Sequence, residues 1–186
     1  MKFNLEVNFQ VEQQLLFFKE HDALLKNWID MLWLSNFCGT TTVDGQTVSM
    51  TDTSNTARSQ GCYRPFILVA AAAVSAYGLV VGTGSGAVTL TDYRLGTQIA
   101  HGVGAGQLSY GGTGLVAPST SGADRSWQAS RTFTNSSGGD ITVNEVGIYV
   151  YSSNPYYYCI ARDLTGGVLI ANTKVGTLTY TFKITV

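Results

Sequence analysis

The N-terminal segment, residues 1–37, constrains most strongly how this chain can fold. Between residues 3 and 11 apolar and polar side chains alternate strictly, which predicts a β-strand of about residues 3–11 with one buried face. From residue 12 to 37 the apolar residues cluster at helical spacing, with no Gly or Pro among them. This second pattern predicts a helix of about residues 12–37, roughly 39 Å long.

The predicted strand and helix carry more apolar surface than one core can cover, since four successive apolar residues, Leu15 to Phe18, cannot all face one side. A neighbouring copy of the chain is one place to hide such surface. We therefore expect residues 1–37 to be an assembly arm, although they could instead fold back on their own domain, residues 38–186. The predicted subunit interface consists of Phe3, Leu5, Val7, Phe9, Val11, Leu15, Phe18, Leu25, Trp28 and Leu32.

Such an arm could work by strand donation. The strand of residues 3–11 would complete the sheet of an adjacent copy, while the helix of residues 12–37 would bridge the subunits. Because this exchange runs head to tail, it would produce a closed ring or an open fibre. A chain that begins at Cys38 is then expected to be monomeric.

After residue 37 the chain has the composition of strands and tight turns, because it contains 21 Gly and 3 Pro in total and only 12% charged residues. Short strands at regular spacing predict a mainly β fold, an antiparallel β-sandwich of jelly-roll or immunoglobulin-like topology. Residues 51–61 are expected to form an exposed connection. The strands are predicted at 41–50 (a hairpin that turns at Asp44-Gly45), 66–73, 77–81, 87–90, 108–110, 127–133, 141–149, 156–162 and 177–186.

Charge and hydropathy exclude several partners. The net charge is −1 and Lys and Arg are scattered, so no nucleic acid is expected. Residues 24–37 are apolar but too short and too interrupted by polar side chains to span a membrane, and the first residues lack the pattern of a classical signal peptide. Cys38, Cys62 and Cys159 lack metal-ligand spacing and are expected to be buried thiols, although a bridge between Cys38 and Cys62 stays open for an extracellular protein.

Few residues suggest chemistry. Glu145 lies on a predicted strand with Arg131 and Arg162 on strands expected nearby. These residues could form a ligand site, but a salt bridge that fixes strand register is the favoured interpretation. His21 and His101 have no partner pattern, and His101 is expected to bond to the backbone of a loop. We therefore expect no catalytic residue, no metal, no cofactor and no enzymatic activity.

Two surface features could bind ligands or carry glycans. Tyr156 and Tyr158 share one face of a predicted strand and are a candidate platform for sugars or for subunit docking. The alternative is that one ring of Tyr156, Tyr157 and Tyr158 is buried and the other two lie on the surface. Asn135 begins an Asn-Ser-Ser sequence, a formal glycosylation acceptor in a compartment that attaches glycans.

About half of the chain resembles a group of uncharacterised structural proteins encoded by phages, prophages and environmental viral genomes. The pieces that carry the resemblance are YGLVVGTG (77–84), DYRL (92–95), IAHG (99–102), FTNSSGGDITVNEVGIY (133–149) and CIARD (159–163). The last two are similar to the paired strands of phage tail and fibre modules. The resemblance implies a fold and a setting but no active site.

Together these observations lead us to expect a non-enzymatic structural protomer that assembles with itself into a phage-like virion component or an extracellular helical fibril. Other virion proteins or surface glycans are further expected partners. A receptor- or glycan-binding fibre module is the alternative function.

Overall fold

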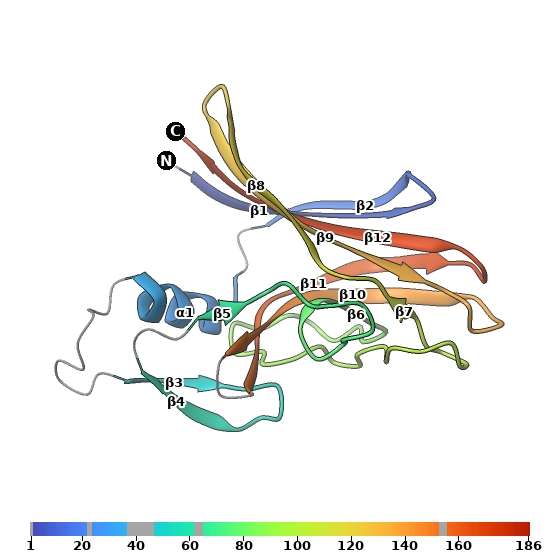
Figure 1. Ribbon diagram of the computed structural model, residues 1–186, viewed down its shortest axis with the longest axis horizontal. Coiled ribbons are helices and arrows are strands. Elements are labelled where there is room, and N and C mark those ends of the chain that lie inside the picture. The colour runs from blue at the N-terminus through green and yellow to red at the C-terminus, as the bar shows by residue number, and fades with distance from the viewer. Residues whose placement is uncertain (1, 22–23, 37–46, 62–64, 153–155) are drawn as a thin grey trace.

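The computed structural model describes residues 2–21, 24–36, 47–61, 65–152 and 156–186. Over these residues the chain is mainly β, with antiparallel strand pairs and one short helix, α1 (Lys26–Asn36). Figure 1 shows two layers of strands, one above the other, with α1 beside one end. One cluster of buried apolar side chains includes residues from both layers.

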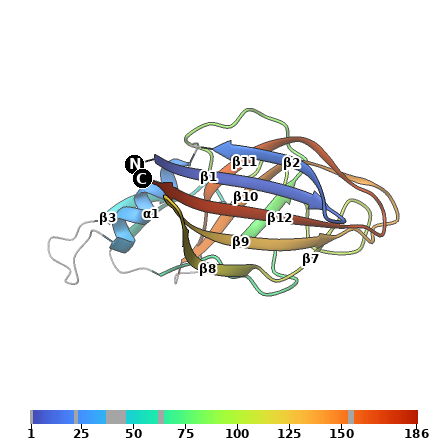
Figure 2. The same ribbon diagram turned by 90° about the horizontal axis from the view of Figure 1, so that it is seen from above.

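The upper layer in Figure 1 is a six-stranded sheet, which we call the large sheet. Its strand order is β2-β1-β12-β9-β7, and β8 pairs with β9 beside β7. Figure 2 shows β2, β1, β12, β9 and β8 side by side. The strands are β1 (Lys2–Val11), β2 (Gln14–His21), β7 (Ser109–Tyr110), β8 (Gly114–Ser121), β9 (Asp124–Thr134) and β12 (Val175–Thr185).

The lower layer is a four-stranded sheet, which we call the small sheet. Its strand β10 pairs with β11 on one side and with both β5 and β6 on the other. A separate hairpin consists of β3 and β4. These elements are β3 (Thr47–Thr51), β4 (Ala57–Gly61), β5 (Phe66–Ile67), β6 (Gly78–Gly82), β10 (Ile141–Ser152) and β11 (Tyr156–Ile170).

The alternating N-terminal segment is a strand, as predicted, but it lies inside the chain's own large sheet. All ten residues of β1 pair with β12, from Lys2 opposite Thr185 to Val11 opposite Gly176. The inward-facing Leu5, Val7 and Phe9 have no exposed surface. The expected free arm is therefore corrected: β1 folds back on its own domain, because β12 offers it a full-length hydrogen-bonding partner.

The predicted helix of residues 12–37 is wrong over its first half, where the structure has strand β2. Glu12 and Gln13 both adopt positive φ, 49° and 68°, the geometry of a two-residue hairpin turn. The hairpin places Phe17 opposite Phe9 against the core. Tertiary pairing with β1 thus overrides the local helical pattern, and the helix begins only at Lys26.

Three other predictions for residues 38–186 are corrected. Residues 57–61 form strand β4 rather than an exposed connection, because the Asp52 carboxylate accepts hydrogen bonds from Ser54 and Thr56 backbone N–H groups and closes the turn before it. Residues 87–90 are not a strand, and the predicted strand at 66–73 is reduced to β5. Asp44 and Gly45, the predicted hairpin turn, lie outside the described residues.

Because β1 belongs to the core, Phe9→Ala is expected to reduce the free energy of unfolding by about 3–5 kcal/mol. The Phe9 ring lies 6.3 Å from that of Phe133, between centroids, and is fully buried. The matched control is Leu16→Ala on exposed β2, which should change stability by no more than about 0.5 kcal/mol. Urea unfolding of the full chain measures both, and equal effects would contradict the burial of β1.

Candidate functional site

The first candidate site is the outer edge of the large sheet at β2, which hydrogen bonds only to β1 among the described strands. Leu15, Leu16 and Phe18 are 51%, 44% and 54% exposed. We call these three residues the β2 patch. Leu15 and Phe18 belong to the predicted interface, whereas Leu16 was missed although it lies within the same apolar run.

The remaining predicted interface residues lie elsewhere. Leu25 is buried in the chain's own core with Leu5, Val7 and Phe9. Phe3 is 37% exposed and stacks on Trp28, with 6.1 Å between ring centroids. Partly buried side chains against the core or on α1 are Val11, Trp28 and Leu32. The structure thus keeps only part of the predicted surface available to another molecule.

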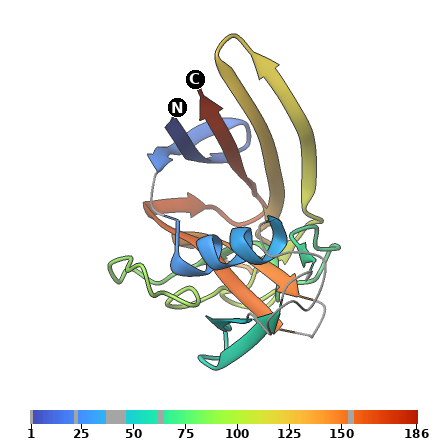
Figure 3. The same ribbon diagram turned by 90° about the vertical axis from the view of Figure 1, so that its left-hand side faces the viewer.

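The opposite edge of the large sheet is β8, which the sequence analysis missed. All eight of its residues are exposed, including Leu115 at 50% and Val116 at 56%, which we call the β8 patch. Figure 3 shows the β8–β9 hairpin extending away from the rest of the chain. Pro118 lies where the register with β9 shifts, a position typical of an edge strand. This Pro is the signal that could have identified the edge.

A second candidate site surrounds Glu145, whose side chain is fully buried on β10. Its carboxylate accepts hydrogen bonds from the backbone N–H groups of Gly84, Gly96 and Thr97, at 3.0, 2.9 and 2.7 Å. It also accepts from Arg162 Nε at 2.8 Å. Glu145 thus forms the expected salt bridge with an arginine, and of the two candidates Arg131 and Arg162 the partner is Arg162, which joins β10 to its neighbour β11.

Arg162 extends this network to the loop between β6 and β7. It pairs with Asp92 Oδ2 at 2.7 Å and donates to the carbonyls of Gly86 and Ala87. Burial would raise the pKa of Asp92, but hydrogen bonds from Thr89 and Arg162 outweigh it and hold that pKa below its ordinary value. The three charged side chains, Glu145, Arg162 and Asp92, all have partners, so the network holds the loop in a structural role. We call these three residues the clamp.

The glycine-rich segment of residues 82–86 belongs to this clamp. It resembles a phosphate-binding loop only superficially, as the absence of a following helix in the sequence indicates. In the structure it surrounds a carboxylate. A Cβ atom on Gly84 would collide with the Glu145 carboxylate, so the close approach of backbone and carboxylate requires glycine here.

Arg131 is a separate structural residue, and among the described residues its guanidinium forms no hydrogen bond or ion pair with Glu145. It is 1% exposed and donates to five backbone carbonyls. Its guanidinium lies over the Tyr110 ring, 4.8 Å from the centroid. Burial lowers its pKa. The carbonyls belong to Ala71, Val74, Tyr77, Leu79 and Gly111.

The predicted platform of Tyr156 and Tyr158 is wrong. Tyr158 is fully buried, and Tyr156 is half-buried with the Arg58 guanidinium 4.2 Å above its ring. Both face the core because the pairing of β10 with β11 fixes which side alternate residues occupy. Tyr157, between them, points the other way. Its ring stacks on Tyr77 with 6.0 Å between centroids and an interplanar angle of 13°.

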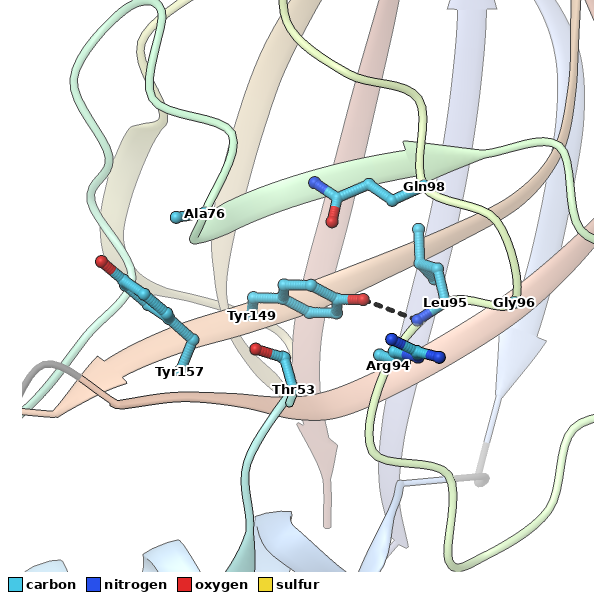
Figure 4. A pocket seen from close by; sticks show the side chains of 8 residues that line it. All are labelled: Thr53, Ala76, Arg94, Leu95, Gly96, Gln98, Tyr149 and Tyr157. Carbon is cyan, nitrogen blue, oxygen red and sulfur yellow. Dashed lines mark hydrogen bonds between the residues drawn. The ribbon is translucent and has the colours of Figure 1, made fainter. Parts of the chain in front are cut away.

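Tyr157 lines a pocket of about 340 Å³ between β10, β11 and the clamped loop (Figure 4). Tyr149 forms one side, and its hydroxyl oxygen accepts a hydrogen bond from Leu95 N at 2.6 Å. The polar side chains around the pocket are those of Thr53, Arg94 and Gln98. No local sequence pattern indicates this pocket, because its residues come from five separate segments of the chain.

Asn135 is not an accessible glycosylation site in the folded chain. Its side chain is fully buried and Nδ2 donates to the carbonyls of Gly139 and Ile170, at 2.8 and 2.7 Å.

His101 Nδ1 accepts a hydrogen bond from Tyr110 N, which confirms its predicted backbone contact. Cys159 is a buried free thiol, as expected. Cys38, Cys62 and the side chain of His21 lie outside the described residues.

In the described part of the chain, no three His, Cys, Asp or Glu side chains are grouped as a metal site would require. No helix among the described residues combines the length and apolar character that a membrane crossing needs. In comparisons with known proteins, no family model, no curated protein and no solved structure matches the chain. The fold and the candidate sites define this chain as a mainly β protein of antiparallel sheets. Its buried charged residues have structural roles, and the edges of its large sheet are apolar.

Because the clamp is buried, Glu145→Gln is expected to lower the free energy of unfolding by about 3 kcal/mol, since it leaves Arg162 short of a buried counter-charge. The control is Glu12→Gln, which removes the exposed pair of Glu12 with Lys174 and should change stability by less than about 1 kcal/mol. Chemical unfolding at pH 7 compares them. A loss below about 1 kcal/mol for Glu145→Gln would show that the clamp is dispensable.

The lowered pKa of Asp92 predicts a dependence on pH. A depressed carboxyl pKa stabilises the folded chain above the ordinary aspartate value, and that contribution is lost as pH falls through the folded-state pKa. Asp92→Asn should therefore be less stable than the natural chain at pH 7, with the difference shrinking below about pH 4. Thermal unfolding at several pH values tests this, and a difference that grows on acidification would refute it.

Proposed function

We propose that this protein is a non-enzymatic structural protomer that assembles with copies of itself through the two edges of its large sheet. The observation that carries the proposal is that both edges, at β2 and β8, expose apolar side chains and have no further strand paired to them among the described residues. Monomeric proteins commonly protect such edges with charges or covering segments. The β8 strand has no charged residue and a single proline, Pro118. The β2 strand carries Glu20 and Lys19, and Lys19 lies 3.9 Å from Asp163 of the same chain.

The two edges favour a head-to-tail arrangement. The β2 edge of one copy would pair with the β8 edge of the next, which extends the large sheet from subunit to subunit. Because the two surfaces differ, the contact is heterologous and yields a ring or a fibre. This changes the donor-strand hypothesis: β1 stays in its own sheet, while β2, also within residues 1–37, supplies the contact.

The expected gain is moderate. If the five side chains of the two patches each bury about 80 Å², the gross gain is about 10 kcal/mol at 25 cal/mol per Å². Association itself costs about 4–15 kcal/mol, so backbone hydrogen bonds along the edges must add to the apolar contact. Assembly should therefore depend on protein concentration, and it should reverse on dilution.

The setting that we propose is a phage-like virion component or an extracellular fibril, with a β-sandwich of jelly-roll or immunoglobulin-like type as its fold. The resemblance of residues 77–163 to phage structural proteins supports this setting. So does the pairing of β10 with β11, which brings together the two pieces that are similar to paired strands of phage tail and fibre modules. Other virion proteins would be further partners.

The edge proposal predicts that Leu16→Glu with Phe18→Glu keeps the chain monomeric at concentrations where the natural chain assembles, because charge on an edge opposes pairing. Light scattering over a concentration series measures the mass, and electron microscopy distinguishes rings from fibres. The matched control replaces Leu90 and Val103, exposed apolar residues of a loop, with Glu. A natural chain that stays monomeric at high concentration, or a double variant that assembles unchanged, would overturn the proposal.

A mixing experiment tests the direction of the contact. One variant carries Glu at Leu16 and Phe18, and the other carries Glu at Leu115 and Val116. Each variant alone should be monomeric, whereas an equimolar mixture should form a heterodimer, because each partner retains one intact edge. Self-association of either variant alone would contradict the head-to-tail contact.

A further inference from the structure

We propose that the pocket between Tyr157, Tyr149 and Arg94 binds a sugar unit that carries a carboxylate. The pocket has about 340 Å³, near the lower end of the roughly 300–1,000 Å³ of small-molecule sites. This site is separate from the sheet edges and does not depend on the proposed assembly. It also differs from the Tyr156 and Tyr158 platform that the sequence suggested.

The aromatic wall suits the apolar face of a sugar ring. Tyr157 is partly exposed and lines the pocket. It is held in place by Tyr77 and by Tyr151, whose ring centroid lies 5.7 Å away. A fixed ring loses little conformational freedom when a ligand packs on it. An aromatic side chain also offers flat apolar area with a polar tip, which matches a molecule with both apolar and polar faces.

The polar groups around the pocket match hydroxyl groups. Gln98 Nε2 donates to Ser75 O at 2.6 Å, and its carbonyl oxygen points toward Tyr149 in Figure 4. That oxygen can accept from a sugar hydroxyl. The Tyr149 hydroxyl accepts from Leu95 N, so its own proton can be donated to a ligand. Thr53 adds a third hydrogen-bonding side chain at the pocket.

Arg94 determines the expected charge of the ligand. Its side chain is exposed at the pocket, and no carboxylate in the described part of the chain pairs with it. A guanidinium prefers a carboxylate or phosphate, which it can bind with two parallel hydrogen bonds. One arginine beside several neutral polar groups suits a single carboxylate better than the multiple charges of a nucleotide. The mixture of polar groups also disfavours a lipid.

The clamp beneath the pocket keeps these groups in place. Gly96, which lines the pocket, donates its N–H to Glu145, and Thr97 beside it does the same. The backbone that carries Arg94, Leu95 and Gln98 is thereby fixed to the small sheet. A site whose supporting loop is fixed before binding needs less ordering when the ligand arrives. This gives the buried charges of Glu145 and Arg162 a positioning role toward the pocket.

The test is ligand-observed NMR and calorimetry on the full chain. The probes are the methyl glycosides of glucuronic acid, galacturonic acid and N-acetylneuraminic acid, with methyl glucoside as the neutral comparison. At least one acidic probe should bind more tightly than the glucoside. Arg94→Gln should weaken the acidic probe about tenfold, equivalent to about 1.4 kcal/mol, and leave the neutral one unchanged.

Tyr157→Ala should weaken every probe that binds. The matched control is Arg125→Gln, which removes an exposed arginine of β9 outside this pocket and should change nothing. Thermal unfolding of each variant verifies that it folds. Absence of binding by all acidic probes, or equal binding by Arg94→Gln and the natural chain, would overturn the inference. The glutamate variants of β2 should bind sugar normally, so the failure of either proposal is seen separately.

Discussion

The pairing of β1 with β12 is the interaction on which the rest of the structure depends. It joins the first strand to the last along their full length and supplies Leu5, Val7 and Phe9 to the core. It also determines where the next segment lies: the tight turn at Glu12 and Gln13 folds β2 against β1. The β2 patch is exposed at the edge of the large sheet for this reason, so one pairing creates both the core and the proposed contact surface.

Buried arginines organise the parts of the chain that lack regular strands. Arg131 holds the segment before β6 through backbone carbonyls, and Arg162 holds the following loop through Asp92, Glu145 and further carbonyls. Each guanidinium satisfies backbone groups that would otherwise be buried without partners. The hydrogen bonds and ion pairs of Arg131 and Arg162 thus stabilise long loops. The loop held by Arg162 forms one wall of the pocket that we assign to an acidic sugar.

The sequence predicted the elements whose local pattern agrees with their surroundings. Strict alternation identified β1, β9, β10 and β12. It also placed Glu145, Arg131 and Arg162 on strands expected to be neighbours, and the structure pairs Glu145 with Arg162. The helix prediction failed at Leu15 to Phe18, because consecutive apolar residues fit a helix or a hairpin strand equally well until β1 is in place. The pocket could not be predicted, since Thr53, Arg94 and Tyr157 meet only through tertiary folding. The burial of Asn135 likewise arises from tertiary contacts, which its Asn-Ser-Ser sequence does not indicate.

The most direct test of this account is amide hydrogen exchange of β1 at a protein concentration at which light scattering finds the chain monomeric. Because β12 and β2 flank β1 within one chain, its central amides, around Leu5 to Phe9, should be strongly protected, and the protection should not change with protein concentration. Rapid exchange of these amides in the monomer, with protection that appears only on assembly, would contradict the account and restore strand donation between copies.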